Sequence, residues 1–239
     1  MNETEYVAIA ESGHEVQNPT SPAKLGEVAE HLEIGAGDRV LDVGSGRGFW
    51  AVELAKLGAD VVGLEINADF TAAAEQRAAA AGVRQRLRTV LGPAAEFEPE
   101  PGASTVGSCL GASFAFGGYR QALEWLAGAL ADGGRLAIGE LHSLDDSAGD
   151  ELPSLSELVH IAEELDFEVT GLVSASTDDW DRYESQHWKN VLDWAKRNPE
   201  HPERDSVLAD SRRFRNDYLS HRGELGWTIV LGAKKVSAG

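Results

Sequence analysis

Residues 39–48 read RVLDVGSGRG, and this stretch decides the fold. The apolar run 40–43 encloses a single acid, Asp42, and glycine then recurs at positions 44, 46 and 48. Such a pattern is typical of a buried parallel strand that runs into a tight turn and a helix. The turn would direct backbone N–H groups toward an anionic or polar ligand. The stretch therefore predicts a nucleotide-like ligand at the carboxyl end of the first strand.

The spacing of the glycines separates two kinds of nucleotide site. A dinucleotide fingerprint has the form G-x-G-x-x-G, whereas this chain has G-x-G-x-G. The next strand, residues 60–64, ends in Glu65, which lies 21 positions after Gly44. An acid at this distance is placed to accept hydrogen bonds from both hydroxyls of an adenosine ribose. Two alternatives stay open, a nicotinamide or flavin nucleotide and a glycine-rich turn without a ligand.

Residues 40–48, the glycine turn with Asp42 before it, resemble motif I of the class I S-adenosylmethionine-dependent methyltransferases, whose usual form is close to VLDxGxGxG. The resemblance covers residues 36–174 and 226–236. It implies transfer of a methyl group to a small-molecule acceptor and release of S-adenosylhomocysteine. The alternatives are an oxidoreductase that uses a nicotinamide nucleotide and a protein that binds an adenosine ligand without catalysis.

The resemblance also implies a set of cofactor-binding residues. In the family an acid often occupies the position of Pro93 and meets the adenine amine, so backbone groups after this proline are expected to replace it. The implied residues are, in chain order, Asp42, Gly44, Ser45, Gly46, Gly48, Glu65, Ile66, Ala94, Ala95, Leu110 and Gly111.

Loops that leave the carboxyl ends of parallel strands face the ligand crevice, which gives candidates for the acceptor side. Ser113, Phe114 and Phe116 follow the fourth predicted strand; the two phenylalanines line the methyl-transfer pocket or pack the start of a helix. Glu140 and His142 follow the fifth predicted strand. They are candidate general bases, or a surface acid and a surface imidazole.

Strands and helices alternate along the chain, which predicts an α/β fold with a doubly wound, mostly parallel seven-stranded sheet. The resemblance adds that the last strand is antiparallel and lies beside the sixth. The connection between these two strands, residues 175–225, is longer than an ordinary loop. We predict that it forms a helical cap. We expect one domain, made of an N-terminal segment and helix (1–35), the core (36–174 and 226–236) and this cap.

An aromatic stripe runs along the predicted cap. Placed on a helix, Trp180, Tyr183, His187, Val191 and Trp194 share one face, with Trp188 at its margin. The stripe binds the acceptor or packs against the next helix. His14 lies in the weakly patterned segment 1–20, which is either a disordered tail or a lid over the cofactor. Together with the loop candidates, the acceptor side comprises His14, Ser113, Phe114, Phe116, Tyr183, His187 and Trp188.

Composition limits the partners and the compartment. The formal net charge is -19, with 40 acids against 21 bases, and such a surface repels nucleic acids. Cys109 is the only cysteine, so no intrachain disulfide forms, and the scattered histidines show no zinc spacing, so we expect no metal. No apolar run approaches ~18 residues, and the first residues lack a signal-peptide pattern. A cytoplasmic protein is expected, with its oligomeric state open.

Overall fold

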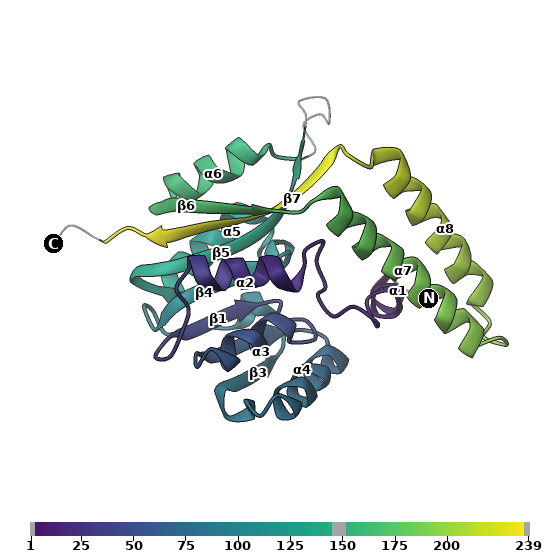
Figure 1. Ribbon diagram of the computed structural model, residues 1–239, viewed down its shortest axis with the longest axis horizontal. Coiled ribbons are helices and arrows are strands. Elements are labelled where there is room, and N and C mark those ends of the chain that lie inside the picture. The colour runs from purple at the N-terminus through teal and green to yellow at the C-terminus, as the bar shows by residue number, and fades with distance from the viewer. Residues whose placement is uncertain (1–2, 145–151, 237–239) are drawn as a thin grey trace.

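A seven-stranded sheet forms the centre of the molecule (Figure 1). The computed structural model describes residues 3–144 and 152–236. The strand order is β3-β2-β1-β4-β5-β7-β6, and β7 is antiparallel to both of its neighbours whereas the other pairs are parallel. The predicted fold class is thereby confirmed. The strands are β1 (Arg39–Val43), β2 (Asp60–Glu65), β3 (Leu87–Leu91), β4 (Ser104–Leu110), β5 (Leu130–Ser143), β6 (Phe167–Ser174) and β7 (Leu225–Lys234).

Helices cover both faces of the sheet. One layer holds α2 (Pro22–His31), α3 (Phe49–Lys56) and α4 (Ala68–Ala80), and the other holds α5 (Tyr119–Ala129) and α6 (Leu155–Glu164) (Figure 1). Successive residues of a strand point to opposite faces, so Val40 packs in the first layer and Leu41 in the second. Ser21 caps the start of α2 and accepts a hydrogen bond from the Lys24 backbone N–H at 3.2 Å.

Two long helices, α7 (Thr177–Arg197) and α8 (Arg204–His221), connect β6 to β7 along the chain. They project beyond the sheet (Figure 1). The N-terminal helix α1 (Glu3–Ala10) rests against α7. A small apolar cluster joins the three helices through Ala10, Val191 and Val207. Within the described ranges, none of the helices has the length and apolar character needed to cross a membrane.

The strand β5 is longer than the sequence pattern predicts. It runs to Ser143, and its last residues pair with the start of β7, with Leu141 opposite Trp227 and His142 opposite Gly226. The region around His142 was expected at a loop rim, and this was wrong. Pairing with a strand far along the chain draws these residues into the sheet, and no local pattern could reveal that pairing.

Two glycines test how tightly this part of the sheet is packed. A Cβ at Gly139 would lie 2.5 Å from the ring of the buried Trp227, whereas one at Gly128 in α5 would meet nothing within 4 Å. We expect Gly139→Ala to lower the free energy of unfolding by about 1–3 kcal/mol through overpacking. Gly128→Ala should raise it by about 0.5–1 kcal/mol, because alanine favours the helix. Urea denaturation of both variants measures the difference, and equal effects would contradict the packing argument.

Candidate functional site

The carboxyl ends of β1, β2 and β4 surround a cavity of about 530 Å³ beside the glycine turn, here called the turn cavity. Eight of the predicted cofactor-binding residues line it. They are Asp42, Gly44, Ser45, Gly46, Glu65, Ile66, Leu110 and Gly111. The sheet thus brings together residues from three separate strand ends, as the parallel topology requires.

Glu65 connects the turn to the end of β2. Its side-chain oxygens accept hydrogen bonds from the backbone N–H groups of Gly46 and Asn67, each at 2.8 Å. The residue is 8% exposed and lines the turn cavity. A carboxylate accepts about four hydrogen bonds, so two further donors such as ribose hydroxyls find acceptor sites on Glu65.

Asp42 and Ser45 offer buried polar atoms to a ligand in the turn cavity. The Oδ1 atom of Asp42 accepts a hydrogen bond from Ser108 Oγ at 2.5 Å, and Trp50 Nε1 donates to the same hydroxyl at 3.3 Å. Asp42 Oδ2 and Ser45 Oγ are buried and have no partner within the described part of the chain. Burial raises the pKa of Asp42 to about 7, and the charge of Glu65 adds to this rise whereas the Ser108 bond opposes it.

Three predicted cofactor-binding residues lie outside the lining of the turn cavity. Gly48 begins α3 with φ of 76°, and a Cβ there would lie 2.5 Å from the Cβ of Ala74, so its role is close packing of α3 on α4. Ala94 is buried in the second core layer, and Ala95 shares its short 3-10 turn. Ile66, by contrast, lines the turn cavity and is 69% exposed. An apolar side chain that covers one face of an adenine ring would be exposed in this way before the ring binds.

The N-terminal segment crosses the turn cavity. Of the two alternatives for this segment, a disordered tail and a lid, its position agrees with the lid. Gln17 Oε1 accepts a hydrogen bond from the Arg47 backbone N–H at 2.7 Å, and Asn18 Nδ2 donates to the Leu110 carbonyl at 3.0 Å. Gln17 and Asn18 both line the cavity. Sequence reasoning missed these two residues, because the segment has no pattern that would place it.

A second cavity, of about 770 Å³, adjoins the first and is here called the aromatic cavity. Six predicted residues line it, namely Ser113, Phe114, Glu140, Tyr183, His187 and Trp188. The two cavities share lining residues from the N-terminal segment, the loop after β4 and α7. The shared residues are Val7, Glu11, Gln17, Asn18, Gly111, Phe114 and Tyr183.

The walls of the aromatic cavity are aromatic and acidic. Its acids are Glu11, Glu140, Glu184 and Asp217, and the described residues that line it include no lysine or arginine. Ser113 Oγ donates a hydrogen bond to the Glu140 carboxylate. The aromatic side chains are Tyr6, Phe114, Trp180, Tyr183, Trp188, Phe214, Tyr218 and Trp227.

Three other acceptor-side or catalytic candidates take different positions. His142 lines neither cavity; it is buried, with Nε2 2.8 Å from Thr228 Oγ1 and Nδ1 3.0 Å from the Ser143 carbonyl, so the structure does not place it as a base. Phe116 packs on Trp125, with ring centroids 4.8 Å apart. His14 is buried behind the aromatic cavity, where its ring contacts Tyr183.

The aromatic stripe of α7 is divided between a cavity wall and an apolar cluster. Trp180, Tyr183 and His187 line the aromatic cavity. Val191 and Trp194, one turn further on, pack in the apolar cluster with α1 and α8. The first half of the stripe therefore faces the cavity, and the second half is core.

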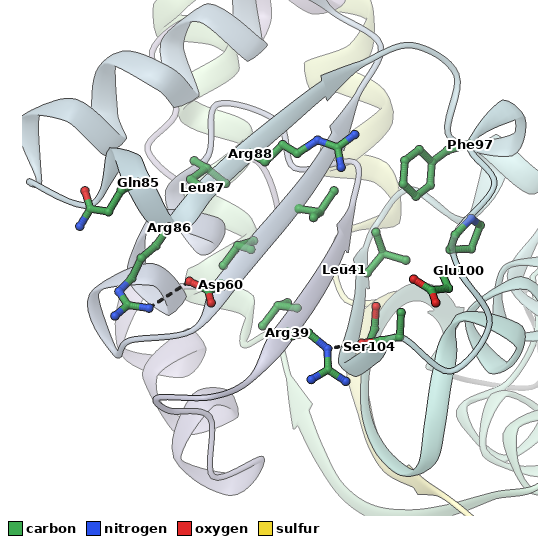
Figure 2. A pocket seen from close by; sticks show the side chains of 15 residues that line it. Arg39, Leu41, Asp60, Gln85, Arg86, Leu87, Arg88, Phe97, Glu100 and Ser104 are labelled. Atoms are coloured by element: carbon green, nitrogen blue, oxygen red, sulfur yellow. Dashed lines mark hydrogen bonds and ion pairs between the residues drawn. The ribbon is translucent and has the colours of Figure 1, made fainter.

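Another hollow, of about 380 Å³, lies at the opposite ends of the strands (Figure 2). Arg39, Asp60 and Ser104, which begin β1, β2 and β4, line it, and Arg86 forms an ion pair with Asp60 at 2.9 Å. Ligands of open α/β sheets bind at the carboxyl ends of the strands. The hollow in Figure 2 is at the amino ends, so the turn cavity and the aromatic cavity form the candidate site.

Comparisons with known proteins agree with this location. A family model described as a methyltransferase domain matches residues 40–134, which include the glycine turn and Glu65. The chain is 30% identical to the uncharacterized protein YjhP of Escherichia coli K12, across 92% of this chain and 94% of that protein.

Two solved structures with bound S-adenosylhomocysteine have the same fold over nearly the whole chain. One is a methyltransferase dependent on S-adenosylmethionine from Geobacter sulfurreducens, with a TM-score of 0.90, 29% identity and coverage of 97% of this chain and 98% of that one. The other, from Thiobacillus denitrificans, has a TM-score of 0.90, 29% identity and coverage of 98% and 100%. With its glycine turn, the acid Glu65 at the end of β2 and these relatives, the chain belongs to the class I S-adenosylmethionine-dependent methyltransferases.

Proposed function

We propose that this enzyme methylates a small molecule that binds in the aromatic cavity. The observation that carries the proposal is the junction of the two cavities, where Gly111 and Phe114 line both. A cofactor in the turn cavity and an acceptor in the aromatic cavity would meet there. The proposal assigns the cofactor to the core, 36–174 and 226–236, and the acceptor chiefly to the segments 1–35 and 175–225.

The charge of the aromatic cavity restricts the acceptor. Four carboxylates line the cavity against the positive charge of His187, whose pKa rises to about 9 because hydrogen bonds to Glu11 and Glu184 outweigh burial, and no lysine or arginine is among the described lining residues. The excess of negative charge would repel an acceptor that carries a phosphate or carboxylate. Aromatic faces and carboxylates together favour a neutral or positively charged group. An amine is therefore the acceptor class to test first.

The residues of the turn cavity fit S-adenosylmethionine. Glu65 would hold the ribose hydroxyls, and Asp42 and Ser45 would pair their free buried atoms with the methionine part. The cofactor, when bound, supplies an activated methyl group. The chain then has to align the acceptor and exclude water. Glu140, which faces the aromatic cavity, is the remaining candidate base for an acceptor that arrives protonated.

The experiment that tests this function is a screen with cofactor labelled in its methyl group against amines, alcohols, thiols and carboxylates. Transfer to an amine would support the proposal, and transfer only to carboxylates or phosphorylated acceptors would contradict the charge argument.

No feature of the site favours a nicotinamide nucleotide. A cytoplasmic location, consistent with a single buried cysteine, remains part of the proposal.

Glu65→Ala should weaken S-adenosylmethionine binding about ten- to a hundredfold, because hydrogen bonds to a charged group contribute about 1.5–3 kcal/mol. Titration calorimetry measures the change. Glu100→Ala is the matched control, since this acid lines the hollow of Figure 2. Equal affinities in the two variants would rule out Glu65 as the ribose acid.

Asp42 should make cofactor binding depend on pH. The methionine ammonium group prefers the ionised carboxylate, so affinity should rise with pH, by up to about tenfold per unit, and level off above the Asp42 pKa of about 7. Asp42→Asn should flatten this profile. The free energy of unfolding of the ligand-free protein should instead fall as the pH rises from ~4 to 7. Folding raises the pKa of the Asp42 carboxyl, so the folded state binds more protons than the unfolded state in this range. An unchanged profile in Asp42→Asn would remove Asp42 from the cofactor site.

A pair of tryptophans on α7 separates acceptor binding from packing. Trp188 lines the aromatic cavity, whereas Trp194 packs beside His201 with ring centroids 5.1 Å apart. We expect Trp188→Ala to keep cofactor affinity and to lower kcat/KM for the acceptor at least tenfold, or about 1.4 kcal/mol. Trp194→Ala should lower the melting temperature and leave transfer by the folded protein near its original rate. The reverse pattern would move the acceptor away from α7.

A further inference from the structure

The sequence E-S-x-H occurs twice, at residues 11–14 and 184–187. The first copy directly follows α1 and the second lies on α7. The fold brings the two copies into contact behind the aromatic cavity. Gly13 permits this approach, because a Cβ there would lie 2.3 Å from Asn190 Oδ1 on α7.

Three side chains of these two copies converge on one point. Glu11 Oε1 lies 2.8 Å from His187 Nε2, and Glu11 Oε2 lies 3.4 Å from His14 Nδ1. One ligand atom from each of the three residues lies within 4.8 Å of the others. A divalent transition metal binds nitrogen and oxygen ligands at about 2.0–2.2 Å, so its ligand atoms are typically about 3–3.5 Å apart. Small side-chain movements would bring this set to that spacing.

The hydrogen bond of His14 to the backbone orients its other ring nitrogen. His14 Nε2 lies 3.0 Å from the Tyr183 backbone carbonyl, which only accepts, so a ring proton belongs on Nε2. The second nitrogen, Nδ1, lies 3.4 Å from Glu11 Oε2 and 3.5 Å from Asn190 Nδ2. His14 Nδ1 and Glu11 Oε2 therefore face each other from the two sides of one small space.

Glu11 Oε2 is itself unsatisfied. It is buried without a hydrogen-bond partner in the part of the chain that the structure describes, and the residue is 8% exposed. A buried carboxylate oxygen left in this way costs about 1–3 kcal/mol or more. A cation between the two copies would remove this cost.

The surrounding residues have the arrangement of an outer shell. Metal-bound histidines usually donate their second N–H to a carbonyl or a carboxylate. His14 does so to the Tyr183 carbonyl, and His187 Nδ1 lies 3.8 Å from Glu184 Oε2. Tyr183 Oη donates to Glu11 Oε1 at 2.7 Å and orients the shared carboxylate.

We propose that Glu11, His14 and His187 form a binding site for one divalent transition metal ion such as Zn²⁺. Two histidines and one carboxylate leave coordination positions open. Glu11 and His187 line the aromatic cavity, so the site borders the space that the acceptor would occupy. Tyr183 holds two of the ligands, because it accepts from His14 and donates to Glu11. The sequence shows no zinc spacing because His187 lies 176 positions from Glu11.

Without metal, His187 Nε2 donates a hydrogen bond to Glu11 Oε1 at 2.8 Å. A metal ion bound by both residues has to replace this proton. Proton release on binding is therefore a second readout of the site, which calorimetry in buffers of different ionisation enthalpy detects.

The test uses the full chain, stripped with a chelator, and titrates it with Zn²⁺ by calorimetry and with Co²⁺ by visible absorption. We expect one equivalent to bind, with Co²⁺ bands of a low-coordinate nitrogen and oxygen site. His187→Ala and Glu11→Gln should each weaken binding at least tenfold. Glu11→Gln keeps the size of the side chain and an acceptor for Tyr183, so it stays informative if His187→Ala unfolds.

His160→Ala is the matched control. His160 is a surface histidine on α6 that pairs with Glu164 at 3.1 Å, and its side chain is 70% exposed. Its loss should leave the affinity unchanged, and Zn²⁺ should raise the melting temperature of this variant as it does for the parent. Equal Zn²⁺ affinity in Glu11→Gln, His160→Ala and the parent would mean that only scattered surface carboxylates bind the ion, and it would overturn the site.

Discussion

The carboxylate of Glu65 ties the glycine turn to the neighbouring strand, and the binding site depends on this tie. Its oxygens accept hydrogen bonds from the backbone N–H of Gly46 in the turn and from that of Asn67 at the cap of α4. Asn67 is the N-cap of α4, where N–H groups lack partners inside the helix, and Gly46 lies in the turn two residues before Gly48, the N-cap of α3. One buried acid therefore fixes the relative position of α3, α4 and the ends of β1 and β2. The same acid keeps acceptor sites for a ligand, so the requirement of the fold and the requirement of the site coincide.

Local patterns in the sequence predict the parts of this arrangement that local chemistry determines. The strand and turn at 39–48, the Ser21 cap and the acid at the end of β2 are all visible within a few residues. The antiparallel last strand came from the family resemblance. The sheet order confirms the architecture, because alternating strands and helices leave few other topologies.

Long-range contacts account for what could not be predicted. His142 resembles a loop residue in the sequence, yet pairing with Gly226 buries it within the sheet. Gln17 and Asn18 carry no motif, and their role exists only because the N-terminal segment meets the turn and the end of β4. Both halves of the α7 stripe carry large side chains on one helix face, and the positions of α1 and α8 decide which half is core.

The N-terminal segment couples the two cavities. At one end Gln17 and Asn18 hold the turn and the end of β4, and at the other Glu11 bonds to Tyr183 and His187 of α7. A second tie, the ion pair between Lys24 and Asp179 at 2.6 Å, fixes the start of α7 to α2. Glu11, Gln17 and Asn18 each line both cavities, and only a few residues separate them along the chain. Because one short segment closes both cavities, a substitution at Gln17 or Glu11 changes a wall that the two cavities have in common.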